Sequence, residues 1–147
     1  MLSPGWVILF KSEKGVWIGG RASESREWSW ADNKTAFIYA NWGPGEPNNH
    51  NNNEYCLEIM RTNGMWNDLP CGNTLPFVCS MSKSSEYNLD GAPNPYKCPV
   101  EKGYKPVGTS CYKVFTELSG YDAAKSTCAS DSAGFKYASL GKIIIII

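Results

Sequence analysis

Six cysteines in a chain of 147 residues are the feature that most limits how it can fold. None of them forms the C-x-x-C pair that is typical of zinc and redox sites. In a short chain this pattern favours disulfide bonds, which form and persist in oxidising compartments. We therefore expect a disulfide-stapled extracellular domain. Asn33 begins the glycosylation sequon Asn-Lys-Thr, which agrees with that location but arises often by chance.

Composition and charge limit the partners of the chain. Hydrophobic residues make up 42% and aromatic residues 13%, which is typical of a globular protein. Basic and acidic residues balance at 14 each, so the positive field that attracts nucleic acids or anionic membranes is absent. The apolar run 6–10 is too short for a signal-peptide core, and the five isoleucines at 143–147 are too few to span a bilayer. We expect no nucleic-acid partner and no membrane insertion, and we interpret the isoleucine tail as an artefact.

The pattern of apolar residues predicts a loop-rich α+β fold. Short β-type runs indicate strands, and later positions spaced as in a hairpin and an amphipathic helix follow a polar stretch broken by Gly91, Pro93 and Pro95. Such a stretch is typical of a linker. The expected strands lie at 16–19, 57–59 and 77–79, the hairpin at 104–115 and the helix at 121–129.

Oxygen-bearing side chains gather in two separate loops of the first half. They are Glu46, Asn48, Glu54, Asn67 and Asp68. Three carboxylates and two amides match the oxygen ligands that calcium prefers, and the ion would offset the repulsion among the acids. Because no EF-hand spacing is present, the ligands come from two loops and one side of the ion can stay open. Two vicinal sugar hydroxyls could then bind the ion, with the acids accepting and the amides donating hydrogen bonds.

Other interpretations of these residues are weaker. Glu46 and Glu54 could serve as the paired acids of a hydrolase, but no environment that raises a pKa is indicated and no nucleophile motif accompanies them, so we expect no enzyme. Taken alone, the run 48–53 with His50 would be a solvated loop. Four tryptophans are expected in the core rather than as a sugar-stacking platform: Trp17, Trp28, Trp30 and Trp42.

Several motifs resemble the C-type lectin domain over residues 16–79. They are Trp17-Ile18-Gly19-Gly20, Glu46-Pro47-Asn48 and Trp66-Asn67-Asp68 followed by Cys71 and Cys79. The resemblance implies that the five oxygen ligands hold one calcium ion and the sugar, that the Glu46–Pro47 bond is cis, and that Cys56 pairs with Cys71. The Glu-Pro-Asn sequence implies preference for mannose-type sugars with equatorial 3- and 4-hydroxyls. Arg26 stands where the family's auxiliary calcium site would need an acid.

Residues 98–140 resemble the opening hairpin and first helix of the same family. The resemblance implies that Cys98 pairs with Cys111. We therefore interpret the chain as the C-terminal part of one module, a linker and the N-terminal part of the next, as in a tandem mannose-receptor-like array. The segments are 1–81, 82–97 and 98–142, followed by the tail 143–147. As a hypothesis, the two truncated modules dock in permuted order with Cys79 bonded to Cys128.

The expected function is calcium-dependent binding of mannose-type glycans on cell or microbial surfaces. The chain would act outside the cell, and its signal peptide would lie outside this fragment. The alternative is a lectin-like structural or protein-binding fragment in which truncation has removed sugar binding.

Overall fold

The computed structural model describes residues 14–33, 36–82, 98–131 and 139–140. The predicted strands, hairpin and helix are all present, whereas most of the expected linker and the isoleucine tail lie outside the described residues. The strands are β1 Val16–Ala22, β2 Trp28–Trp30, β3 Cys56–Ile59, β4 Trp66–Leu69, β5 Leu75–Ser82, β6 Lys105–Val107, β7 Ser110–Ser119 and β8 Ser139–Leu140. The remaining elements are the helix α2 Tyr121–Asp131 and the 3-10 turns η1 His50–Asn52 and η2 Val100–Lys102.

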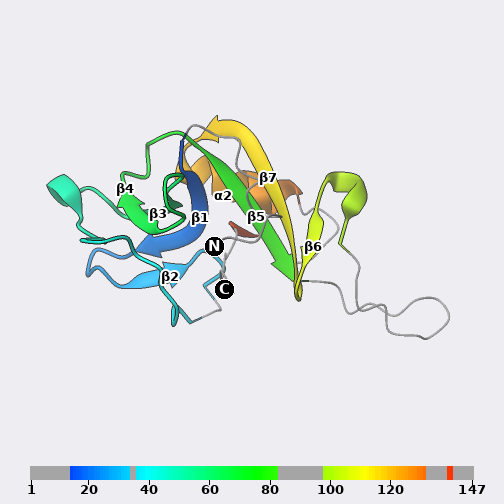
Figure 1. Ribbon diagram of the computed structural model, residues 1–147. Helices are drawn as coiled ribbons and strands as arrows, with labels where there is room; N and C mark the ends of the chain where they lie inside the picture. The colour runs from blue at the N-terminus through cyan, green and yellow to red at the C-terminus, as the bar shows by residue number, and fades with distance from the viewer. Residues whose placement is uncertain (1–13, 34–35, 83–97, 132–138, 141–147) are drawn as a thin grey trace.

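One sheet joins both halves of the chain, in the strand order β4-β3-β1-β5-β7-β6. Strand β5 lies parallel to β1 and antiparallel to β7, with partners from Leu75 opposite Ser119 to Ser82 opposite Ser110. Figure 1 shows β5 and β7 as the long ribbons between the β1–β3–β4 end and the β6 hairpin. The second half therefore extends the sheet of the first.

Alternation along β1 and β5 creates two cores, because successive side chains of a strand point to opposite faces. Trp17 and Phe77 belong to a core that also contains Tyr121 and Cys128 of the helix. Ile18 and Val78 belong to a second core with Trp30 and Trp66. The prediction that four tryptophans belong to the core is confirmed: Trp17 and Trp30 are buried, and Trp28 and Trp42 are partly buried and pack against the second core.

The interface between residues 14–82 and 98–131 is mainly apolar and includes a disulfide bond. Phe77 stacks on Phe115 with ring centroids 4.7 Å apart, and the Trp17 indole donates a hydrogen bond of 2.9 Å to the carbonyl of Ser119. The disulfide Cys79–Cys128 links β5 to α2, so the hypothesis that these cysteines pair as the two halves dock is confirmed. The pairs Cys56–Cys71 and Cys98–Cys111 are also present, as the resemblance implied.

Helix α2 also contributes charge to this interface. Asp122 of this helix, whose side chain is largely exposed, forms an ion pair with Arg21 of β1. No helix in the described parts of the chain is long and apolar enough to cross a membrane.

Candidate functional site

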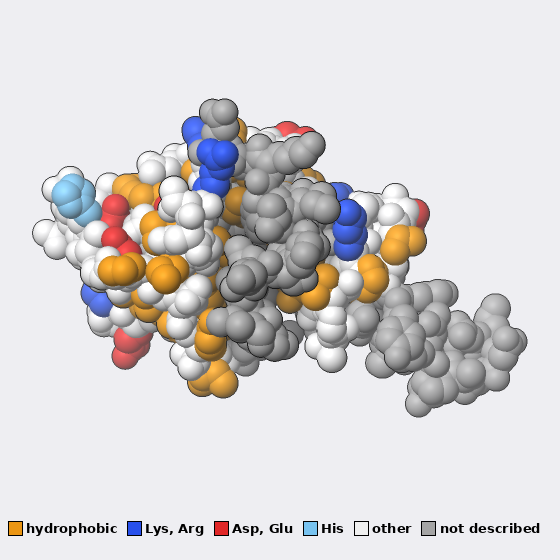
Figure 2. Space-filling view, in the orientation of Figure 1, with side chains coloured by type: hydrophobic (Ala, Val, Ile, Leu, Met, Phe, Trp, Pro, Cys, Tyr) orange, Lys and Arg blue, Asp and Glu red, His pale blue; other side chains and the backbone are white. Residues whose placement is uncertain are grey.

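The five predicted site residues come from the loop before β3 and from β4. Glu46 and Asn48 lie in the loop around η1, Glu54 lies just before β3, and Asn67 and Asp68 lie within β4. Figure 2 shows acidic side chains beside the histidine at this end of the molecule. The bond between Glu46 and Pro47 is cis, as the resemblance implied.

The asparagines of this loop have a conformational reason to be there. Asn49, Asn51 and Asn52 all have positive φ values, between 47° and 55°. This left-handed region is several-fold enriched in asparagine among residues with a side chain. The run that resembled a low-complexity loop therefore forms a defined series of turns.

Asp68 is fully buried at the centre of the site. Its Oδ1 accepts a hydrogen bond of 2.9 Å from the main-chain N–H of Asn48. Its Oδ2 accepts 2.9 Å from the N–H of Asn49 and 2.8 Å from Nη2 of Arg26. A buried carboxylate needs such donors to offset its lost hydration. Asp68 thus fixes the loop containing Pro47 against strand β4.

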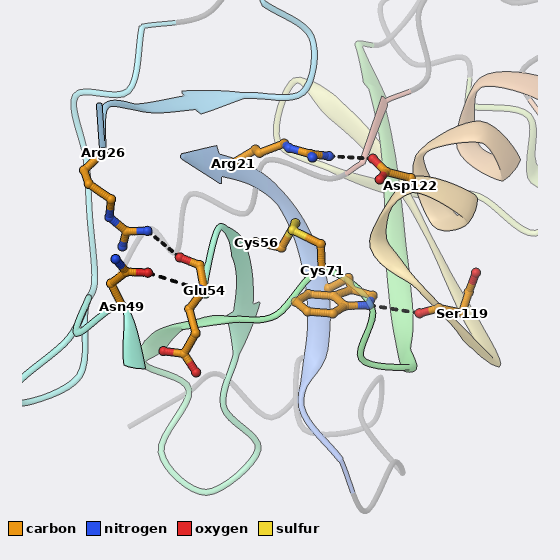
Figure 3. Close-up of a disulfide and its surroundings, with 9 residues drawn as sticks. Arg21, Arg26, Asn49, Glu54, Cys56, Cys71, Ser119 and Asp122 are labelled. Atoms are coloured by element: carbon orange, nitrogen blue, oxygen red, sulfur yellow. Dashed lines mark hydrogen bonds and ion pairs between the residues drawn. A yellow bond between two sulfur atoms is a disulfide. The ribbon is translucent and has the colours of Figure 1, made fainter. Parts of the chain in front are cut away.

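Glu54 is tied to the same loop through its main chain and its side chain. Its Oε2 accepts 2.9 Å from the N–H of His50, and its own N–H donates 3.2 Å to Oδ1 of Asn49. Arg26 donates through Nη1 to the carbonyl of Glu54, and Figure 3 shows Arg26 and Asn49 both reaching the Glu54 main chain. The His50 N–H also donates 2.9 Å to Oδ1 of Asn48, which connects Glu54 with Asn48.

Glu46 adds a third acid to the network. Its Oε1 accepts 3.0 Å from Nδ2 of Asn48, and its Oε2 accepts 3.1 Å from the Asn48 N–H. The pKa of Glu46 is raised, first by burial and then by contact with the Asp68 carboxylate and the charges of Asp68 and Glu54. The expectation that nothing here raises a pKa was therefore wrong. Burial is the largest cause, and the nearby carboxylates of Asp68 and Glu54 add to it. A divalent cation would relieve the part that comes from like charges.

Asn67 joins the site through a residue that the sequence did not single out. Its Nδ2 donates 3.1 Å to Oε1 of Glu58, which is 8% exposed and lies opposite Asn67 in the β3–β4 register. Burial, followed by the charge of Glu54, raises the pKa of Glu58, while the Asn67 amide lowers it. Pairing in a two-stranded ladder was the signal that could have identified Glu58.

The structure thus links Glu46, Asn48, Glu54 and Asp68 in one hydrogen-bond network and places Asn67 on Glu58. In the described part of the chain, no three histidine, cysteine or acidic side chains are already arranged to hold a metal ion. The chemistry of the donors nevertheless fits calcium, because all are oxygens of carboxylates or amides and the acids repel one another. The acids accept hydrogen bonds from main-chain N–H groups in this arrangement.

Comparison with known proteins gives a consistent result. The model of the lectin C-type domain matches residues 6–81. The chain is 43% identical over 72 residues to a C-type lectin of Micrurus corallinus, covering 47% of this chain and 45% of that one. It is 42% identical over 79 residues to a C-type lectin of Cerberus rynchops, covering 50% and 49%. A relative from Oxyuranus scutellatus, described as a C-type lectin mannose-binding isoform, is 42% identical over 72 residues, covering 47% and 45%.

The chain therefore spans about half the length of the curated relatives it matches. Among solved structures, the EPNH mutant of CEL-I is 32% identical, with a TM-score of 0.41 and coverage of 45% of this chain and 48% of that chain. The sheet, the single described α-helix and the three disulfides form a C-type lectin-like fold. The family model covers more than half of the sequence. The chain belongs to the C-type lectin domain family.

Proposed function

We propose that this chain binds mannose-type sugars through one calcium ion held by Glu46, Asn48, Glu54, Asn67 and Asp68. The observation that carries the proposal is the connected network of carboxylate and amide groups drawn from the loop before β3 and from β4. Two acids of the network, Glu54 and Asp68, are buried and fixed by main-chain donors, whereas Glu46 and Asn48 lie nearer the solvent. Such a site has a rigid base and an open side.

Each group has a distinct role in this proposal. Bound calcium would supply the coordination sites that two vicinal hydroxyls of the sugar occupy. Glu46 and Glu54 are acceptors for the hydroxyl protons, and the amide of Asn48 can donate from nitrogen while its oxygen faces the ion. Glu58 holds the amide of Asn67 through Nδ2, which leaves Oδ1 for the ion. The proposal includes no catalytic step.

The wider setting follows from the same features. Three disulfides suit an extracellular protein, and a relative described as a mannose-binding isoform supports the class of sugar. We infer glycans of cell or microbial surfaces as partners. Weak single sites gain strength through multivalency, and a tandem array of modules would provide it.

The test is retention on mannose-agarose in calcium, followed by elution with a chelator. We expect retention that EGTA abolishes, competition by mannose and weaker competition by galactose. Glu54→Gln removes one charged ligand while keeping the shape of a buried side chain, so retention should be lost. Glu24→Gln, at an exposed position of the neighbouring loop, is the matched control and should bind normally. Retention that persists in EGTA would contradict the proposal and favour a lectin-like protein-binding role.

A further inference from the structure

Arg26 is a cation built into the candidate site. Its Nη2 lies 2.8 Å from Oδ2 of the buried Asp68, and its Nη1 donates to the carbonyl of Glu54. One guanidinium thus connects β4 with Glu54, two residues before β3, over sequence separations of 42 and 28 residues. Figure 3 shows its side chain directed at the Glu54 main chain.

The surroundings of Arg26 hold it in this position. The guanidinium carbon lies 5.8 Å from the ring centroid of Trp28 and 5.2 Å from that of Tyr55. Its N–H donates 3.0 Å to the carbonyl of Ser23, which closes the turn before β2. Arginine stacks on aromatic rings and offers donors in a planar fork, so it suits a site with two acceptors and two rings.

Charge balance gives this contact a consequence for ion binding. The three carboxylates of the site carry one more negative charge than a calcium ion can neutralise. Arg26 removes that excess, because it pairs with the only acid of the three that is fully buried. The remaining charge of these three carboxylates and Arg26 together equals in size that of one divalent ion; Glu58, a neighbouring acid whose pKa is raised by burial, is not counted in this balance.

We propose that Arg26 is a positioning residue that preforms the calcium site: it fixes the Asp68 carboxylate and the Glu54 main chain before any ion binds. This inference rests on the proposed function, because a preformed site matters only if calcium binds there. The order of the loop itself can be measured without calcium or sugar. Ligands that are already in place lose less conformational freedom when the ion arrives.

The test is amide hydrogen exchange of the whole chain in EGTA and in calcium, comparing the wild type with Arg26→Gln. The reporters are the N–H groups of Asn48, Asn49 and His50, which donate to Asp68 and Glu54. In EGTA these amides should exchange roughly ten-fold faster or more in Arg26→Gln, since a hydrogen bond to a charged partner is lost. Calcium should restore their protection, so its effect on exchange should be larger in the variant than in the wild type.

Two further variants distinguish positioning from a general loss of stability. Arg21→Gln removes an arginine that also pairs with an aspartate and faces a tyrosine ring, but outside the site, so the loop amides should keep their protection. Arg26→Lys keeps the charge with a single ammonium group and should restore protection only in part. Amides of the β5–β7 ladder report the global fold and should be unchanged in Arg26→Gln.

The outcomes separate this inference from the proposed function. Loop amides equally protected in EGTA in Arg26→Gln and the wild type would overturn the role of Arg26. Full restoration by lysine would overturn the bridging role. If calcium changed exchange in neither protein, the proposed function would fail, even where the difference in EGTA persisted.

Discussion

Two regions of this molecule are stabilised by different interactions. At the interface of β5, β7 and α2, buried apolar side chains and the Cys79–Cys128 disulfide join segments that are far apart in sequence. At the candidate site, the loop before β3 is held by hydrogen bonds among charged and amide groups around Asp68. The first region gains stability from removing apolar surface from water, the second from satisfying buried polar groups.

This difference implies that removing a metal ion should affect the candidate site and leave the interface unchanged. The interface contains apolar rings and a covalent bond, so a chelator has nothing to remove there. The candidate site has three acids and one arginine, and its order depends on their balance. We expect the global stability to depend on the interface, and the proposed sugar binding to depend on the candidate site.

The largest expected effect comes from removing the disulfide between the halves. Replacing Cys79 and Cys128 with alanine opens a closed loop whose ends are 49 residues apart, and the chain-entropy relation gives a loss of about 4 kcal/mol in the free energy of unfolding. Denaturation in guanidinium chloride measures it. The control is the same double replacement at Cys98 and Cys111, with a separation of 13 and an expected loss of about 3 kcal/mol. The reverse order would show that the interface does not depend on its covalent link.

The second prediction concerns Glu58, which holds the side chain of the proposed ligand Asn67, and its test is Glu58→Gln. The variant removes the charged acceptor that fixes the Asn67 amide, and losing such an outer partner costs roughly 10- to 100-fold in metal affinity. Calorimetric titration with calcium measures it. Glu117→Gln, at an exposed position of β7, is the control and should bind calcium normally. Unchanged affinity in Glu58→Gln would mean that Asn67 needs no support.

Local patterns in the sequence predicted much of the fold. Short apolar runs at 16–19 and 77–79 indicated strands, and the spacing at 121–129 indicated the helix, because both patterns depend on neighbouring residues alone. The sequence pattern did not indicate that β5 pairs with β7, since periodicity defines the faces of a strand but not its neighbour. The unpaired cysteines of the two halves were the one long-range clue.

The site divides in the same way. The five residues expected to bind calcium were singled out because they carry carboxylates or amides, four of them within two recognisable motifs and Glu54 shortly after the first. The roles of Arg26 and Glu58 were not predicted, because each depends on a partner that only folding brings near: Asp68 lies 42 residues from Arg26, and Asn67 meets Glu58 across a ladder. The arginine was visible in the sequence only as a departure from expected acids.

The smallest expected effect returns to the interface and concerns one hydroxyl. Tyr121 is fully buried, its ring packs edge-on against Trp17 at 5.8 Å, and burial raises the pKa of its phenol. Among the described residues its hydroxyl has no hydrogen-bond partner, so Tyr121→Phe should leave the free energy of unfolding unchanged or raise it by up to about 1 kcal/mol. Tyr112→Phe, at a partly buried position of β7, is the control: burial raises the pKa of its phenol and the nearby Ser110 side chain lowers it, so we expect a loss of up to about 1 kcal/mol from the missing polar contact. A loss in Tyr121→Phe as large as in the control would show that the Tyr121 hydroxyl stabilises this interface and is not an unsatisfied group.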